Sequence, residues 1–217
     1  MKLSLVLRGI EDVASREILR DFRPDSCIAA TKIIIRVLRR FGYEAQAIPA
    51  RLVMGNRAFT KLVEEKGVIP SMEEAIEAGW FVKHGAWSVG IGYQSVLAGT
   101  GHQSLLRKAE NAGPTPEGKW NGHVVAFLPR HNTLIDASIT QGNRPAKGIV
   151  FPGVLIVTGI SRYFLTGEGI LRGEYNGCLI EYRPFQDESF RRAPDWTDDH
   201  RVKRAVKAIV KYIETLR

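Results

Sequence analysis

Three residues of this chain could together perform nucleophilic catalysis: Cys27, His123 and Asp136. A thiol becomes a strong nucleophile when an imidazole takes its proton, and a carboxylate can hold that imidazole in the required tautomer and stabilise its charge. Cys27 follows Asp25 and Ser26, a good N-cap pair, so we expect its thiol in the first turn of a helix. The positive end of the helix dipole stabilises a thiolate there. The alternative interpretation is an inert core cysteine, since cysteine is among the residues most often buried.

A predicted β-hairpin brings the histidine and the aspartate together. Two apolar runs, residues 122–128 and 133–138, are separated by a four-residue turn signal. In the register that this loop sets, Asp136 lies opposite Val125, so His123 and Asp136 are diagonal neighbours on one face, with backbones about 7–8 Å apart. A one-residue change in loop length would reverse this, because side chains alternate along a strand. The alternatives are a half-buried histidine with satisfied hydrogen bonds and an aspartate that caps a turn.

The elements that position these residues indicate an α+β fold. Residues 27–41 contain neither glycine nor proline, and they predict a long helix whose apolar stripe includes Cys27 and which ends at Gly42. A short amphipathic helix is expected at 11–22 and a mostly helical connector at 57–79. Strands are expected at 43–56, as one or two strands with Pro49 at an edge or bend, and at 80–93, 149–160 and 177–182. A long surface loop is expected at 98–119. This order predicts N-terminal helices packed on an antiparallel sheet, followed by a C-terminal amphipathic helix at about 198–216.

The composition fits one globular domain spanning residues 1–217, with its core at about 24–160. The chain has 217 residues, of which 44% are hydrophobic and 25% charged, which is an ordinary globular balance. Its two cysteines are too few for a disulfide scaffold, so a reducing, cytoplasmic setting is the default expectation. No apolar run approaches the roughly 18 residues that a membrane span needs, and Arg8, Glu11 and Asp12 interrupt the apolar start before a signal-peptide core could form.

The positive charge allows a polyanionic partner but does not indicate one. The formal net charge is +8, and long-range attraction could serve nucleic acid or another polyanion. The basic side of the C-terminal helix, at 203–211, lacks aromatic stacking residues, and no nucleic-acid-binding motif is present. The histidines and cysteines show no metal-ligand spacing, so we expect neither metal nor cofactor.

The order and context of the three candidate residues resemble a known core. The residues that carry the resemblance are Pro24–Cys27 at the start of a long helix, Leu38–Ala45 at its end, Trp120–His123 on one strand and Leu134–Ser138 on the next. They resemble the transglutaminase-like core, a branch of the papain-like cysteine-enzyme superfamily that also contains the arylamine N-acetyltransferases. The resemblance covers residues 24–141 and implies a helix packed on an antiparallel sheet. It also implies that Cys27 is the nucleophile, His123 the general base and acid, and Asp136 the orienting carboxylate.

The sequence departs from this family pattern in two places. Transglutaminase-like sequences often carry a tryptophan two residues after the histidine, where this chain has Val125. No glutamine precedes Cys27 to serve as the oxyanion donor of papain-type peptidases, which argues against a peptidase of that type. The donors would then be the backbone N–H of Cys27 and a second group, either the Trp120 indole or a group in residues 85–95.

The function expected from these observations is that of a thiol enzyme. It would form a thioester at Cys27 and pass the acyl group of a peptide or small-molecule substrate to water or an amine, with amide hydrolysis as the first choice. One alternative is a basic binding or structural module for a polyanion, and another is the same fold with a catalytically silent site. We expect Cys178 to be an inert strand cysteine, whereas Trp80, Trp87 and Trp120 line a substrate pocket or belong to the core.

Overall fold

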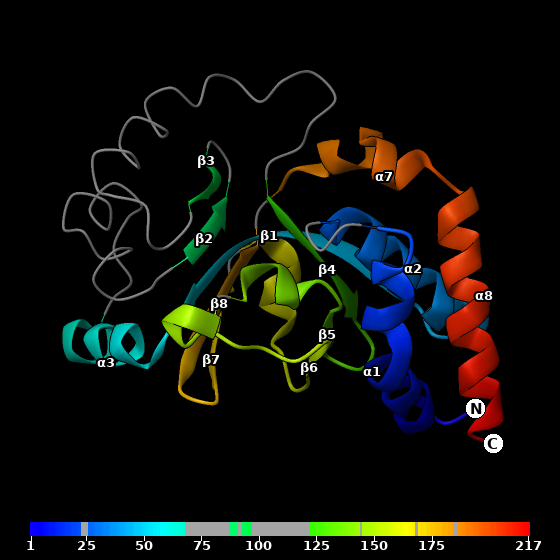
Figure 1. Cartoon of the computed structure of the whole chain (residues 1–217), viewed down its shortest axis with the longest axis horizontal. Helices are drawn as coiled ribbons and strands as arrows, with labels where there is room; N and C mark the ends of the chain where they lie inside the picture. Colours follow the sequence, from blue (N-terminus) through cyan, green and yellow to red (C-terminus); the bar gives the residue numbers. More distant parts are fainter. Residues whose placement is uncertain are drawn as a thin grey trace.

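A computed structural model gives the fold of the chain (Figure 1). It describes residues 1–22, 26–67, 87–90, 93–96 and 122–217, except residues 144, 168 and 185. The loop predicted at 98–119, most of the connector predicted at 57–79, and the residues Trp80 and Trp120 lie outside the described residues. Only the backbone of Trp87 is described.

Three long helices pack together on one side of the molecule. They are α1 (Leu3–Leu19), α2 (Cys27–Arg40) and α8 (His200–Thr215), and Figure 1 shows them side by side. Shorter helices are α3 (Arg57–Lys66) and α7 (Pro194–Thr197), together with the 3-10 helices η1 (Ile139–Gly142), η2 (Pro145–Lys147), η3 (Arg162–Thr166) and η4 (Glu188–Arg192). The predicted α2 and α8 are confirmed, and Gly42 follows α2 in the left-handed region at φ +83°, which glycine adopts without strain.

Helix α1 begins eight residues earlier than the sequence predicted and ends three residues earlier. The prediction at 11–22 was wrong in these bounds because the apolar stripe continues backwards through Ile10 and Val6, both fully buried. A glycine inside the helix does not break it here, since Gly9 lies against α8. A Cβ at Gly9 would lie 2.4 Å from Ile213 Cγ1, so the missing side chain allows the two helices to approach closely.

The sheet contains eight strands, and every described pairing is antiparallel. Six follow the order β3-β2-β1-β4-β5-β6, while β8 pairs with β1 and β7 pairs with β8. The strands are β1 (Gln46–Gly55), β2 (Trp87–Gly90), β3 (Tyr93–Val96), β4 (His123–Leu128), β5 (Thr133–Asp136), β6 (Leu155–Val157), β7 (Leu171–Tyr175) and β8 (Cys178–Pro184). The α+β class with helices on an antiparallel sheet is therefore confirmed.

Several strands differ from their predicted extent. The segment predicted at 43–56 is a single strand, β1, which pairs with β2, β4 and β8. Pro49 itself is paired on one side only, with Val124 of β4, because the pairing with β8 begins at Ala50, and a proline is tolerated at such a position. Strand β6 has three residues instead of the span predicted at 149–160. Strand β7 was missed because it is largely exposed and polar, without the apolar alternation that marks a half-buried strand.

The sheet has an apolar core on each side. Helices α1, α2 and α8 cover one face, where their apolar stripes meet β4 and β5. The other face carries a second cluster that includes Phe127, Phe164 and Tyr182. Among the described helices, none is long and apolar enough to cross a membrane.

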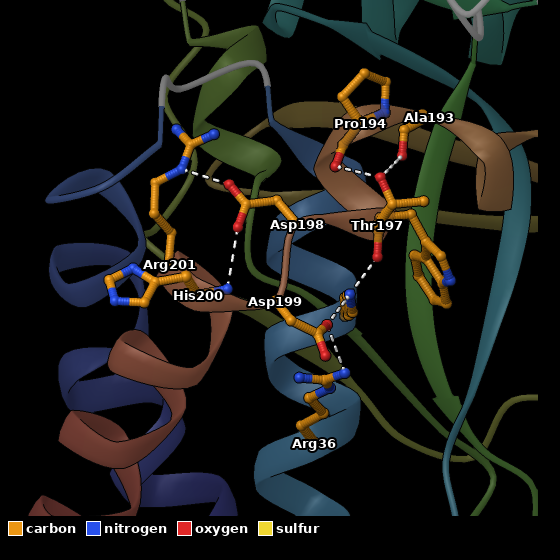
Figure 2. Close-up of polar contacts among 10 residues, drawn as sticks. Arg36, Ala193, Pro194, Thr197, Asp198, Asp199, His200 and Arg201 are labelled. Carbon is orange, nitrogen blue, oxygen red and sulfur yellow. Dashed lines mark hydrogen bonds and ion pairs between the residues drawn. The ribbon is translucent and has the colours of Figure 1, made fainter.

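Helix α2 is tied to the start of α8 by charged side chains. Asp199, which directly precedes α8, accepts a hydrogen bond of 2.8 Å from Arg36 of α2. Figure 2 shows this contact as a dashed line. The same carboxylate accepts a hydrogen bond of 2.6 Å from Lys32 Nζ, which also donates to the carbonyl of Trp196. Lys32 is buried, so these contacts satisfy a charge that would otherwise be costly to bury.

Candidate active site

The hairpin of β4 and β5 has the predicted register. Leu128 pairs with Thr133, and the pairing continues to Ala126 opposite Ile135. The register places His123, the first residue of β4, beside Asp136, the last residue of β5: His123 Nε2 lies 2.6 Å from Asp136 Oδ2. The predicted proximity of these two residues is confirmed, and both are buried.

Asp136 is surrounded by hydrogen-bond donors. Its Oδ2 also accepts from the Tyr182 hydroxyl at 2.8 Å, and its Oδ1 accepts from the backbone N–H and the hydroxyl of Ser138 at 2.9 and 3.1 Å. Burial alone would raise the pKa of Asp136. The positive charge of His123, its hydrogen bond and those from Ser138 and Tyr182 instead hold this pKa below its ordinary value. The carboxylate therefore stays ionised and fixed in orientation.

The contact between His123 and Asp136 also determines the charge of the His123 imidazole. Complete burial would lower the pKa of His123, but the charge of Asp136 and its hydrogen bond, with smaller contributions from Cys27, raise this pKa to about 10. Tyr182 stays a neutral donor because burial and the charge of Asp136 raise the pKa of its hydroxyl well above 10. At neutral pH the site therefore holds an imidazolium beside a carboxylate.

Cys27 reaches this pair from the first position of α2. The residue is 6% exposed, and its Sγ lies 3.8 Å from the carbonyl oxygen of Gly122, the residue directly before His123. Cys27 also interacts with the imidazole, because its hydrogen bond and charge contribute to the raised pKa of His123. The structure thus brings together all three residues that the sequence singled out, at the point where the N-terminal end of α2 meets the beginning of β4.

Sequence reasoning missed three residues that contact the pair. Gln141, in η1, places its Nε2 atom 2.6 Å from His123 Nδ1. Ser138 and Tyr182 both bind Asp136. Ser138 follows β5 closely enough to be suspected as a capping partner of Asp136. Tyr182 could have been found only by knowing that β8 pairs with β1, and no periodic signal marks Gln141.

Two other residues that the sequence singled out are Trp120 and Cys178. Trp120, the predicted oxyanion donor, lies outside the described residues. Cys178 is buried on β8, as expected of a strand cysteine, and its thiol donates to the carbonyl of Gly148 at 3.1 Å. In the part of the chain that the structure describes, no three His, Cys, Asp or Glu side chains form a group that could hold a metal ion.

Comparison of the chain with protein-family models, with curated proteins and with solved structures found no match. The resemblance to the transglutaminase-like core therefore stays a prediction that depends on the residues themselves. The geometry of Cys27, His123 and Asp136 is the observation from which a function can be argued.

Proposed function

We propose that the protein is a thiol enzyme of the transglutaminase-like type, which forms a thioester at Cys27 and transfers the acyl group to water or an amine. The observation that carries the proposal is the buried pair of His123 and Asp136, joined at 2.6 Å, with the Cys27 thiol beside it at the start of a helix. In this proposal, α2 and the strands that it covers are a papain-like core. The two cysteines are both free, which suits a reducing compartment such as the cytoplasm.

The first half of the reaction forms the thioester. Because Nε2 of His123 is bound to Asp136, Nδ1 is the nitrogen left for Cys27; in the reactive form the thiol has already given its proton to Nδ1, so a Cys27 thiolate lies beside the imidazolium. The Sγ thiolate attacks the carbonyl carbon of an amide or activated acyl group, which forms a C–S bond. The bond to the leaving group then breaks, and the leaving amine or alcohol takes its proton from Nδ1.

The second half releases the acyl group. Water or an acceptor amine gives a proton to Nδ1 and attacks the thioester carbon. The C–S bond breaks and Sγ leaves as a thiolate beside the imidazolium, which keeps the proton taken from the water or amine, so the enzyme returns to its starting state without an oxidant or a cofactor. Asp136 keeps its negative charge throughout and stabilises the imidazolium in both halves.

One oxyanion donor follows from the position of the nucleophile. The backbone N–H groups in the first turn of an α-helix have no partner within the helix. Since Cys27 is the first residue of α2, its own N–H is available to a negatively charged oxygen formed at the attacked carbon. Amide hydrolysis is our first choice among the acyl transfers that this arrangement supports.

The proposal can be tested by trapping the acyl group. Incubation of the intact chain with 4-nitrophenyl acetate should acetylate Cys27, as mapped by peptide mass spectrometry, and the adduct should be lost with time as water or an added amine removes it. Cys178 is the internal control, because it is a buried thiol of the same chain without an imidazole partner among its described contacts.

Two variants separate activation from simple thiol chemistry. Cys27→Ser should lose the adduct, and His123→Ala should form it much more slowly while Cys178 is unaffected. Equal acetylation of Cys27 and Cys178 in the folded wild-type chain, or unchanged acetylation of Cys27 in His123→Ala, would contradict the proposal.

A further inference from the structure

His123 has more partners than its ring can bind at once. Asp136 binds Nε2 at 2.6 Å, and Gln141 Nε2 lies 2.6 Å from Nδ1. The thiol of Cys27, which the proposed reaction needs at Nδ1, lies beside the residue before His123, with Sγ 3.8 Å from the carbonyl oxygen of Gly122. Each imidazole nitrogen offers one in-plane position, either a lone pair or a proton. Gln141 and Cys27 therefore compete for Nδ1.

The local backbone fixes Gln141 in this competing position. Ser138 is attached to Asp136 Oδ1 through its backbone N–H and its hydroxyl. The backbone N–H of Gln141 in turn donates to the carbonyl of Ser138 at 3.0 Å, in the 3-10 helix η1. The fully buried Ile139 anchors the same turn in the core. The carboxylate on one side of the imidazole and the amide on the other are thus parts of one short, hydrogen-bonded segment.

A side-chain amide can bind Nδ1 in either protonation state. Its NH₂ group donates to a neutral Nδ1, whereas its carbonyl oxygen accepts from a protonated Nδ1 after the amide turns over. A carboxylate or a cation would favour only one of the two states. An amide is therefore suited to hold the imidazole in place without fixing its charge.

We propose that Gln141 is a positioning residue that occupies Nδ1 of His123 in the resting site and yields this nitrogen to Cys27 when an acyl substrate enters. This inference rests on the proposed function of the site and adds a means of regulating it. In the resting state the Nδ1 proton of the imidazolium is bound to the Gln141 amide, and this N–H becomes fully available to stabilise a Cys27 thiolate only when the amide moves away.

The groups that set the charge of His123 are the same in both states. Among the described residues, the titratable side chains that face it are Asp136 from β5, Cys27 from α2 and Tyr182 from β8. Replacement of Gln141 by another neutral residue adds no charge to this set. A change in the alkylation rate of Cys27 in such a variant therefore reports the release of His123 Nδ1.

The test is the pH profile of Cys27 alkylation by iodoacetamide, followed by peptide mass spectrometry on the full chain. Gln141→Ala should accelerate Cys27 about tenfold at neutral pH and shift the profile to lower pH, because the freed Nδ1 proton stabilises the thiolate. Gln141→Glu should not accelerate it, because the new carboxylate retains the proton on Nδ1. Gln186→Ala removes an exposed glutamine and is the matched control, with the wild-type profile expected.

A second measurement reads the histidine directly. The ¹⁵N resonance of His123 Nδ1 should shift in Gln141→Ala and stay unchanged in Gln186→Ala, whether or not the thiol reacts. An unchanged or slower Cys27 rate in a folded Gln141→Ala variant, or an unshifted Nδ1 resonance, would overturn the role of Gln141. The proposed function fails by a different result, namely an unchanged Cys27 rate in His123→Ala.

Discussion

At the scale of single residues, Asp136 determines the state of the site. It accepts hydrogen bonds from His123, from Tyr182 and twice from Ser138, so its orientation and its ionisation are fixed together. A buried imidazole without such a partner would be neutral, since burial disfavours the charged form. The raised pKa of His123 is therefore a consequence of Asp136, and a substitution there should reverse it.

Asp136→Asn should lower the pKa of His123 from about 10 to below its ordinary value of 6.5. The negative charge is lost, while the burial that disfavours the imidazolium remains. NMR titration of the imidazole resonances measures this directly, and Asp12→Asn, at an exposed position, is the matched control. A pKa that stays near 10 in Asp136→Asn would show that another group holds the proton.

At the scale of elements, the site depends on how α2 is held against the sheet. Lys32 and Arg36 of α2 both bind Asp199 at the start of α8, and Lys32 also donates to the carbonyl of Trp196. These contacts tie the helix that carries Cys27 to the C-terminal part of the chain. They occupy the middle of α2, so they stabilise the fold without touching the candidate site.

Lys32→Met should destabilise the protein by about 1.5–3 kcal/mol, the usual contribution of hydrogen bonds made by a charged group. The methionine side chain fits the buried position but leaves the carbonyl of Trp196 without its donor. Urea unfolding measures the change. Lys203→Met, at an exposed position of α8, should change the free energy of unfolding by much less. Equal effects of the two substitutions would contradict the anchoring role of Lys32.

The sequence was most informative where a local signal determined the element. The run from Cys27 to Gly42 contained its own start and stop signals, and the four-residue loop of the hairpin determined the register that joins His123 to Asp136. Contacts between distant segments could not be predicted in this way. The pairing that brings Tyr182 to Asp136, the packing of Gly9 against α8 and the turn that carries Gln141 all depend on the tertiary structure.

At the scale of the whole molecule, part of the positive charge is paired within the chain. Arg201 and Arg204 of α8 bind Asp198 and Asp21, and the Arg201 guanidinium also lies over the ring of Phe22. These basic side chains serve contacts between α8 and its neighbours. The net charge of +8 is therefore a weaker indication of a polyanionic partner than the composition alone suggests.

The buried ion pair should also make the stability of the whole molecule depend on pH. The folded-state pKa of His123 is raised from 6.5 to about 10, so its contribution is complete below pH 6.5 and is lost as the pH rises through about 10. Asp136 acts in the opposite sense. Because its folded-state pKa is lowered, it stabilises the folded chain above about pH 3.8, and this contribution is lost as the pH falls below that value.

The free energy of unfolding should therefore fall more steeply between pH 6.5 and 10 in the wild type than in Asp136→Asn. The difference in slope should be at most about 1.4 kcal/mol per pH unit, the effect of one proton. Denaturant unfolding at a series of pH values and constant ionic strength gives both slopes. Parallel curves would mean that the pair does not take up this proton on folding.

The most direct test of the central claim, that His123 activates Cys27, is the rate at which each cysteine of the native chain reacts with iodoacetamide at neutral pH. The two cysteine residues are similarly buried, at 6% and 3% exposed, so a large difference in rate reports activation. Our account predicts that Cys27 reacts at least about tenfold faster than Cys178, and that His123→Ala removes this advantage. Equal rates for the two cysteines, unchanged by His123→Ala, would contradict it.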